Sequence, residues 1–191
     1  TNADRHKRRQ TQTQTDTNGS AQFVSTSNYV GTNGSGSYSG DPGAPGVSLL
    51  KGTFGMNSKA RFRDYRDGKS NTFVVGERAW RIQHPVAGPR KCSAASLFGV
   101  GSDGTFPLRR RNLASGIGKI NSHISDTVGR PQCEQGYSSR HVGGAQFLLG
   151  DGAVRFISEN VESDPDFSDS NEKFVFQNLL NKADENVIGE Y

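Results

Sequence analysis

The sequence predicts an α+β fold that is mainly antiparallel β, with long loops and a short C-terminal helix. The segments 145–149 and 153–157 are apolar runs with the two-residue period of half-buried strands. Gly150, Asp151 and Gly152 join them, and Asp-Gly between such runs is a strong hairpin signal because Gly can adopt the positive φ that hairpin loops require. A three-residue loop with Gly152 in the left-handed conformation would place a bulge at the start of the second strand. We expect the two strands to be a central pair of the sheet.

The helix is predicted over 172–181, where Phe176, Leu179 and Leu180 fall at helical spacing. Asp169 or Ser170 precedes it as a candidate N-cap.

Another buried strand is predicted at 71–78 (NTFVVGER), because Val, Phe and Thr favour strands. Before it, Phe62 and Tyr65 indicate a short helix or turn that Asp67 and Gly68 close. Weaker patterns predict short strands at 28–31, 52–55, 97–100 and 186–189.

The composition allows only a modest core. Of the 191 residues, 31% are hydrophobic and 24 are Gly, so much of the chain must be loop or short strand. Residues 1–27 are a polar, low-complexity N-terminal extension, for which disorder is the default expectation because it cannot bury enough apolar surface to offset the entropy of ordering. Residues 28–191 are expected to form the globular domain. The long loop region 81–137 is a candidate functional surface.

The net charge of +4 comes largely from local runs, Asp4–Arg9 and Arg109–Arg111. We expect both runs to be solvated surface and predict no nucleic-acid partner, because no basic stripe interleaved with aromatic residues accompanies them. No segment approaches the about 18 apolar residues of a membrane helix. Cys92 and Cys133 are too few for a disulfide framework and lack metal-binding spacing. They could form one bridge if the protein is exported, and the sequence leaves this open.

His141 and Asp151 are the residues that most invite a catalytic or metal interpretation, yet we expect both to be structural. Asp151 would fix the hairpin turn through bonds to its own backbone, and His141 would hydrogen-bond across a neighbouring strand or loop. Gly143 and Gly144 would allow a close approach of the backbone. No catalytic residue, metal site or cofactor is predicted, because one His and one Asp supply neither a nucleophile nor enough metal ligands. Ser138 and Ser139 beside His141 would suggest a hydrolase only if a third, orienting group converges on them.

Two further sets of polar residues carry weaker predictions. Glu77 and Arg78 are neighbours on a predicted strand and must face opposite sides, so one of them points inward to a paired polar site. We expect Arg63 or Arg155 to be the partner of Glu77. Oxygen atoms that a cation such as calcium could use come from Asp64, Asp67, Ser70 and Asn71, but we expect these residues to serve local turns.

Several ordered motifs resemble those of one family. Nine residues separate His141 from Asp151 and Gly152, which is the spacing of an H-X9-DG motif. The segments 27–31 (SNYVG), 63–72 (RDYRDGKSNT), 75–78 (VGER) and the C-terminal 182–191 also match. Together they resemble the DUF1559 family of prepilin-like proteins, which is abundant in planctomycetes. The motif residues of the resemblance are His141, Gly143, Gly144, Asp151 and Gly152.

The resemblance implies a pilin- or pseudopilin-like sheet that packs on an N-terminal helix, and export by a type IV pilin or type II secretion-like route. The expected location is therefore extracellular or at the cell surface, with membrane contact only through an N-terminal helix that this sequence lacks. We expect a non-enzymatic structural subunit that assembles with itself, as an oligomer or filament, or with other envelope proteins. The alternative is an exported module that binds a solute or glycan with the 81–137 loops, to which Trp80 or Tyr137 would contribute an aromatic surface. A third hypothesis is a hydrolase that uses His141.

Overall fold

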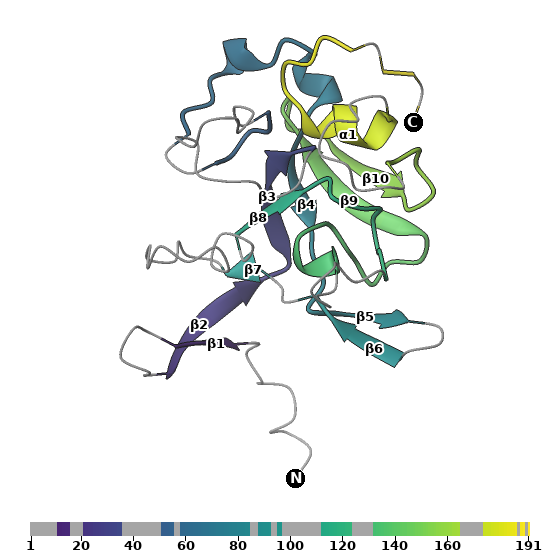
Figure 1. Cartoon of the computed structure of the whole chain (residues 1–191). Helices are drawn as coiled ribbons and strands as arrows, with labels where there is room; N and C mark the ends of the chain where they lie inside the picture. Colours follow the sequence, from purple (N-terminus) through teal and green to yellow (C-terminus); the bar gives the residue numbers. More distant parts are fainter. Residues whose placement is uncertain are drawn as a thin grey trace.

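A computed structural model of the chain describes residues 11–15, 21–35, 51–55, 58–84, 88–92, 95–96, 112–123, 132–164, 174–186, 188–189 and 191. Its centre is a five-stranded sheet with the order β10-β9-β4-β3-β8 (Figure 1). All neighbouring strands in this sheet are antiparallel except β3 and β8, which are parallel. The strands are β3 (Tyr29–Gly34), β4 (Phe73–Glu77), β8 (Leu113–Ser115), β9 (Gly144–Leu149) and β10 (Val154–Ser158).

Smaller elements extend from this sheet. Strands β1 (Thr11–Thr15), β2 (Ala21–Ser27) and β7 (Ala95–Ser96) form a three-stranded sheet, and β5 (Arg81–His84) pairs with β6 (Gly88–Lys91) as a hairpin. The 3-10 helices are η2 (Phe62–Asp64), η3 (Lys69–Asn71) and η5 (Gln132–Glu134), and the α-helix in the described part of the chain is α1 (Val175–Leu180). The predicted α+β, mainly antiparallel class is confirmed. Strands β1 and β2 lie within the 1–27 extension. The default expectation of disorder therefore does not hold for these two segments.

The predicted hairpin is present as β9 and β10. The amide of Leu149 donates to the carbonyl of Ala153, and the amide of Gly152 donates to the carbonyl of Leu149. Gly152 has a φ of 93°, the left-handed conformation predicted for it. The expectation that both strands are central was wrong for β10, because no described strand pairs with its outer side. Its exposed residues Val154 and Phe156 fit that edge position.

Other predictions need correction. Helix α1 spans Val175–Leu180, shorter than the predicted 172–181, and its N-cap Phe174 supplies no side-chain hydrogen bond. The candidate caps Asp169 and Ser170 lie outside the described residues, as does the predicted strand at 97–100. The segment 51–55 is irregular, and the described residues of 186–189 form no strand. No helix in the described ranges has both the length and the apolar character needed to cross a membrane.

The core lies between the inner face of the sheet and α1. Phe73 from β4 stacks on Phe147 from β9 with their ring centroids 4.4 Å apart, and Phe176 from α1 packs edge-on against Phe147 at 6.0 Å. Tyr137 completes the cluster 5.0 Å from Phe147, and its hydroxyl bonds Thr32 at 3.1 Å. Burial raises the pKa of Tyr137 well above its ordinary value, partly opposed by the hydrogen bond with Thr32, so this side chain stays neutral.

The outer face of the sheet is also apolar but open. The strand registers align Leu113, Gly31, Val75, Leu148 and Val154 in one row across all five strands. The ring of Phe54 covers Gly31, and Val154 is 63% exposed. The next row holds Tyr29, Glu77, Gln146 and Phe156. We call these two rows the outer face. Its opening to solvent contrasts with the packed inner face.

Candidate functional site

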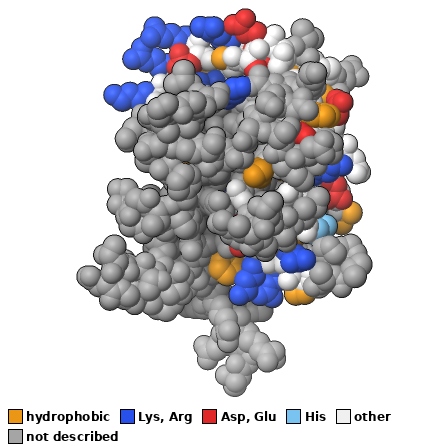
Figure 2. Space-filling model, in the orientation of Figure 1, with side chains coloured by type: hydrophobic (Ala, Val, Ile, Leu, Met, Phe, Trp, Pro, Cys, Tyr) orange, Lys and Arg blue, Asp and Glu red, His pale blue; other side chains and the backbone are white. Residues whose placement is uncertain are grey.

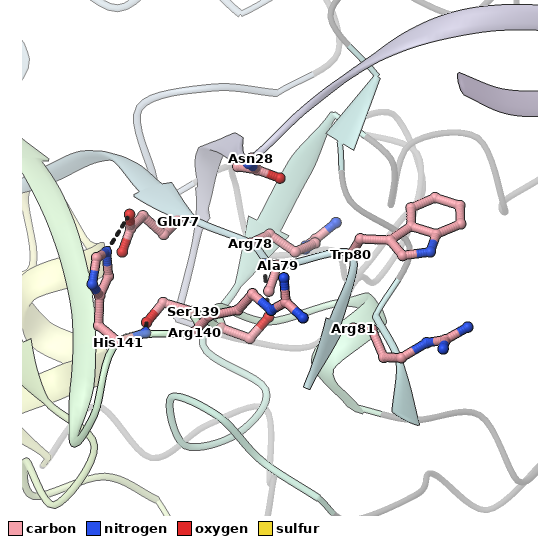
Figure 3. Close-up of a pocket in the computed structure, with 10 residues that line it drawn as sticks. Asn28, Glu77, Arg78, Ala79, Trp80, Arg81, Ser139, Arg140 and His141 are labelled. Atoms are coloured by element: carbon pink, nitrogen blue, oxygen red, sulfur yellow. Dashed lines mark hydrogen bonds and ion pairs between the residues drawn. The ribbon is translucent and has the colours of Figure 1, made fainter. Parts of the chain in front are cut away.

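A cleft of about 390 Å³ opens at the end of strand β4 (Figure 3). Two segments that are distant in sequence, 77–81 and 138–141, form its walls, and Asn28 from the junction of β2 and β3 adds a third side. The residues that line it are Asn28, Glu77, Arg78, Ala79, Trp80, Arg81, Ser138, Ser139, Arg140 and His141.

Backbone hydrogen bonds hold these segments together. Ser138 N donates to Glu77 O at 3.0 Å, and Ala79 N donates to Ser138 O at 2.9 Å, which makes a short parallel bridge beyond the end of β4. Arg78 N donates to Asn28 O at 2.7 Å. The cleft is therefore built on backbone that continues the sheet, which makes its walls rigid.

Arg78 is the inward-facing member of the Glu77–Arg78 pair and is fully buried. Its Nε donates to the carbonyl of Gly136 at 2.9 Å, and a terminal nitrogen donates to the carbonyl of Leu113 at 3.0 Å. Leu113 lies on β8, which β3 separates from β4, and Gly136 lies in the segment before Ser138, so the guanidinium links the end of β4 to both. Buried charge is tolerated only when its donors are satisfied, and this arrangement meets that need.

The expected pairing of Glu77 with Arg63 or Arg155 was wrong. Glu77 Oε2 accepts a hydrogen bond from the amide of Gln146 at 2.8 Å, and Oε1 lies 3.3 Å from His141 Nε2. Arg63 is exposed beside Asp64, and Arg155 lies over the ring of Tyr191. The side chain of Glu77 is largely buried, with 13% of its surface exposed, whereas the side chain of His141 is 57% exposed. His141 therefore lies beside the end of β4, and its predicted hydrogen bond across a neighbouring strand or loop stays a prediction.

The geometry does not favour the hydrolase hypothesis. Ser138 is fully buried, and its hydroxyl accepts the amide of Ala79. The hydroxyl of Ser139 donates to the carbonyl of Gly144 and accepts the backbone amide of His141 rather than contacting its imidazole. Both hydroxyls are therefore committed to backbone groups, and a Ser–His pair for nucleophilic attack is not assembled.

His141 and Asp151 lie at opposite ends of β9, separated by about 20 Å if the six-residue strand rises about 3.3 Å per residue. Asp151 Oδ1 accepts the amide of Ala153 at 2.9 Å. This hydrogen bond is the main reason that the pKa of Asp151 falls below its ordinary value. Gly143 has a φ of 82°, and a Cβ on Gly144 would collide with the carbonyl of Ile157. The motif residues thus frame one hairpin instead of converging on a reaction site.

The cleft also presents groups that are open to solvent. Trp80 is half-buried, and Arg81 and Arg140 are exposed. In Figure 3, Trp80 and Arg81 extend from one end of the cleft, Glu77 and His141 stand at the other, and Arg140 lies between them. Sequence reasoning suggested Trp80 as a ligand-binding aromatic residue but did not single out Arg81 or Arg140, because no local signal links segments about 60 residues apart. Tyr137, the other suggested ligand-binding aromatic residue, belongs to the core.

A disulfide joins Cys92 and Cys133, whose state the sequence left open. It ties the end of β6 to η5, and with Ala79 and Ile82 it forms a second small core beneath the cleft. The amide of Cys92 donates to the carbonyl of Trp80 at 2.9 Å. The bridge therefore anchors the backbone that presents Trp80.

Asp64 and Asn71 serve local turns as expected, but the expectation was wrong for Asp67, whose carboxylate binds backbone amides near the C-terminus. Asp64 Oδ2 accepts the amide of Arg61, and the Asp67 carboxylate accepts the amides of Asp184 and Glu185. The described parts of the chain contain no group of three or more His, Cys, Asp or Glu that could hold a metal ion.

Comparison with known proteins gives one match. The model of a family described as "Protein of unknown function (DUF1559)" matches residues 3–164. No curated protein and no solved structure matches the chain.

Proposed function

We propose that this chain, which belongs to the DUF1559 family, is a non-enzymatic, pilin-like structural subunit that assembles with copies of itself at the cell envelope. The observation that carries the proposal is the outer face of the five-stranded sheet. Apolar side chains cross it from Leu113 to Val154, although this is the side that α1 leaves open.

Exposure of this face is the first support. Tyr29 is 58% exposed, Val154 63% and Phe156 48%. Scattered apolar side chains are normal on a protein surface, but Val154 and Phe156 adjoin each other on one sheet face, and contiguous patches mark interaction sites. Tyr29 lies on the same face, beyond Glu77 and Gln146. In a pilin-like subunit, one sheet face packs on a helix, and the outer face offers the surface for such packing.

The edge strand β10 is the second support. Backbone groups on the outer side of an edge strand are free to pair with a strand of another chain. Natural edge strands are often protected by charges or Pro, and here the one charge, Arg155, is on the opposite face, while Val154 and Phe156 place apolar side chains on the outer face. A second copy that pairs with β10 would extend the sheet and the apolar outer face together.

The cell-envelope location rests on the family resemblance and on the disulfide, because disulfides persist mainly in oxidising compartments. Mass spectrometry of the intact protein from its native source tests this point. A mass lower by two hydrogen atoms than that of the dithiol form is expected, and free thiols in the freshly isolated protein would count against export.

The assembly is tested with the full 191-residue chain, its disulfide intact, by sedimentation velocity up to the highest soluble concentration. We expect reversible self-association that Phe156→Glu abolishes, because the charge would be buried against a second copy. Val142→Glu is the matched control, since Val142 is 98% exposed and lies outside the strands. A strictly monomeric wild type, or association that both variants keep, would overturn the proposal.

The cleft favours a second candidate, an exported module that binds a small solute or glycan, although of the 81–137 region expected to bind it only Arg81 lines the cleft. Polar side chains and one aromatic residue line this concave site, as in many ligand sites. A thermal-shift screen tests it, because a ligand that binds only the folded chain raises the melting temperature. If no ligand in a broad screen of solutes and glycans raises it, this candidate falls.

A further inference from the structure

We infer that the cleft at the end of β4 binds an acidic saccharide, with Arg81 and Arg140 holding its carboxylate and Trp80 packing against a sugar ring. This inference deepens the second candidate function and rests on it. It is independent of the assembly proposal, because it uses other side chains.

The charge available to a ligand is positive. Arg81 and Arg140 are exposed at the cleft, and neither makes an ion pair with any residue in the described ranges. Lys91 is the cross-strand partner of Arg81 in the β5–β6 hairpin and is also exposed. Figure 2 shows Lys and Arg side chains gathered at this lower end of the molecule. A guanidinium binds a carboxylate through two parallel hydrogen bonds, which gives both strength and orientation.

The remaining charged groups of the cleft are already engaged. Glu77, its one acidic lining residue, is only 13% exposed, and its carboxylate oxygens face the Gln146 amide and His141. The buried guanidinium of Arg78 donates to carbonyls in the wall and adds a positive charge beneath the surface. With Arg78, Arg81 and Arg140 against Glu77, the lining favours an anion.

Trp80 supplies the flat apolar surface. Its carbonyl accepts the amide of Cys92, and the disulfide behind it fixes that backbone, so little conformational entropy is lost when a ligand packs on the indole. An aromatic side chain with an apolar face and a polar edge suits a sugar ring, whose C–H face is apolar and whose hydroxyls are polar. Asn28 and the half-exposed imidazole of His141 stand where ring hydroxyls could bond.

A nucleic acid fits the cleft less well. Single-stranded nucleic acids bind along grooves with several aromatic side chains on which successive bases stack, together with many phosphate contacts. The cleft lining has one aromatic residue, Trp80, and two exposed arginines. An acidic sugar residue, which has one ring and one carboxylate, matches this single aromatic residue and this pair of arginines.

The test uses isothermal titration calorimetry on the full chain with α-1,4-linked trigalacturonate as the probe, and with maltotriose as a neutral α-1,4-linked trisaccharide for comparison. We expect trigalacturonate to bind and maltotriose to bind at least about tenfold more weakly, as the loss of one charge-assisted contact implies. Arg140→Gln and Arg81→Gln should each weaken trigalacturonate by about tenfold. Trp80→Phe should weaken it less, because a ring remains.

The matched control is Arg63→Gln, because Arg63 is an exposed arginine that precedes the start of β4, whereas the cleft lies at the end of that strand. It should leave the affinity within about twofold. Equal weakening by Arg63→Gln, or displacement of the probe by sulfate or an oligonucleotide at the same concentration, would show general anion attraction and overturn the inference. Equal affinity for maltotriose overturns the acidic class but leaves the binding module standing. If no saccharide binds and none raises the melting temperature, both the acidic-saccharide inference and the binding-module candidate are wrong.

Discussion

Replacement of Arg78 by Met tests the side-chain contacts that link the end of β4 to β8 and to the cleft wall. Arg78 is fully buried and donates to the carbonyls of Gly136 and Leu113. Met retains much of the apolar stem but donates to neither carbonyl. Each buried acceptor left without a partner costs about 1–3 kcal/mol, so the gross loss is about 2–6 kcal/mol. Removing a desolvated charge returns part of this, and we expect a net loss of about 2–4 kcal/mol.

The loss is measured by urea unfolding, followed by circular dichroism and by the fluorescence of Trp80, the single tryptophan. Arg81→Met is the matched control, because Arg81 is exposed and should change the free energy of unfolding by less than about 0.5 kcal/mol. Arg78→Lys keeps the charge but cannot reproduce the planar fork, so it should lose at least half as much as Arg78→Met. If Arg78→Met unfolds within 0.5 kcal/mol of Arg81→Met, on the order of experimental error, the two carbonyls do not depend on the guanidinium.

Three further changes have expected outcomes. Replacing Cys92 and Cys133 by Ser opens a bridge between positions 41 residues apart and should cost about 4 kcal/mol in the chain-entropy model, measured by urea unfolding. Gly144→Ala should cost about 1–3 kcal/mol because the Cβ meets backbone, whereas Gly189→Ala, with open space around it, should cost little in the same assay. Asp151→Ala should lower the melting temperature at pH 7. Because the folded pKa of Asp151 is depressed, its contribution is present above the unfolded pKa of about 3.9 and is lost as the pH falls through the folded pKa, so the difference from wild type should shrink in acid.

The sequence predicted those parts of the fold that depend on neighbouring residues. The β9–β10 hairpin follows from two alternating runs and from Gly152, whose conformation is set by the turn. Strand β4 was predicted from its Val and Phe content, and the 3-10 turn at Phe62 from the residues beside Gly68. In each case the signal and the structure lie within about ten residues of each other.

Features that depend on distant segments were missed. The edge position of β10 depends on which strand would pair with its outer side, and its own sequence cannot specify that. The partners of Arg78 lie 58 and 35 residues away, and His141 lies 64 residues after Glu77. The wrong guess that Glu77 pairs with an arginine followed charge complementarity. The carboxylate instead accepts the backbone amide of Gln146 on the neighbouring strand β9. Every residue except Pro has such an amide, so the sequence does not mark this one as a partner.

Glu77 belongs both to the outer face and to the cleft, whereas Phe156 and Arg140 each belong to one of them. Variants of these three residues therefore distinguish the two proposed surfaces. Phe156→Glu changes only the outer face, so it should abolish self-association and keep trigalacturonate binding. Arg140→Gln changes only the cleft, so it should do the reverse. Glu77→Ala removes the acceptor for the Gln146 amide and the contact to His141, so it should weaken both properties. Sedimentation and calorimetry on the same three preparations check this. Loss of both properties in Phe156→Glu would show one surface serving both roles, and the division proposed between face and cleft would be wrong.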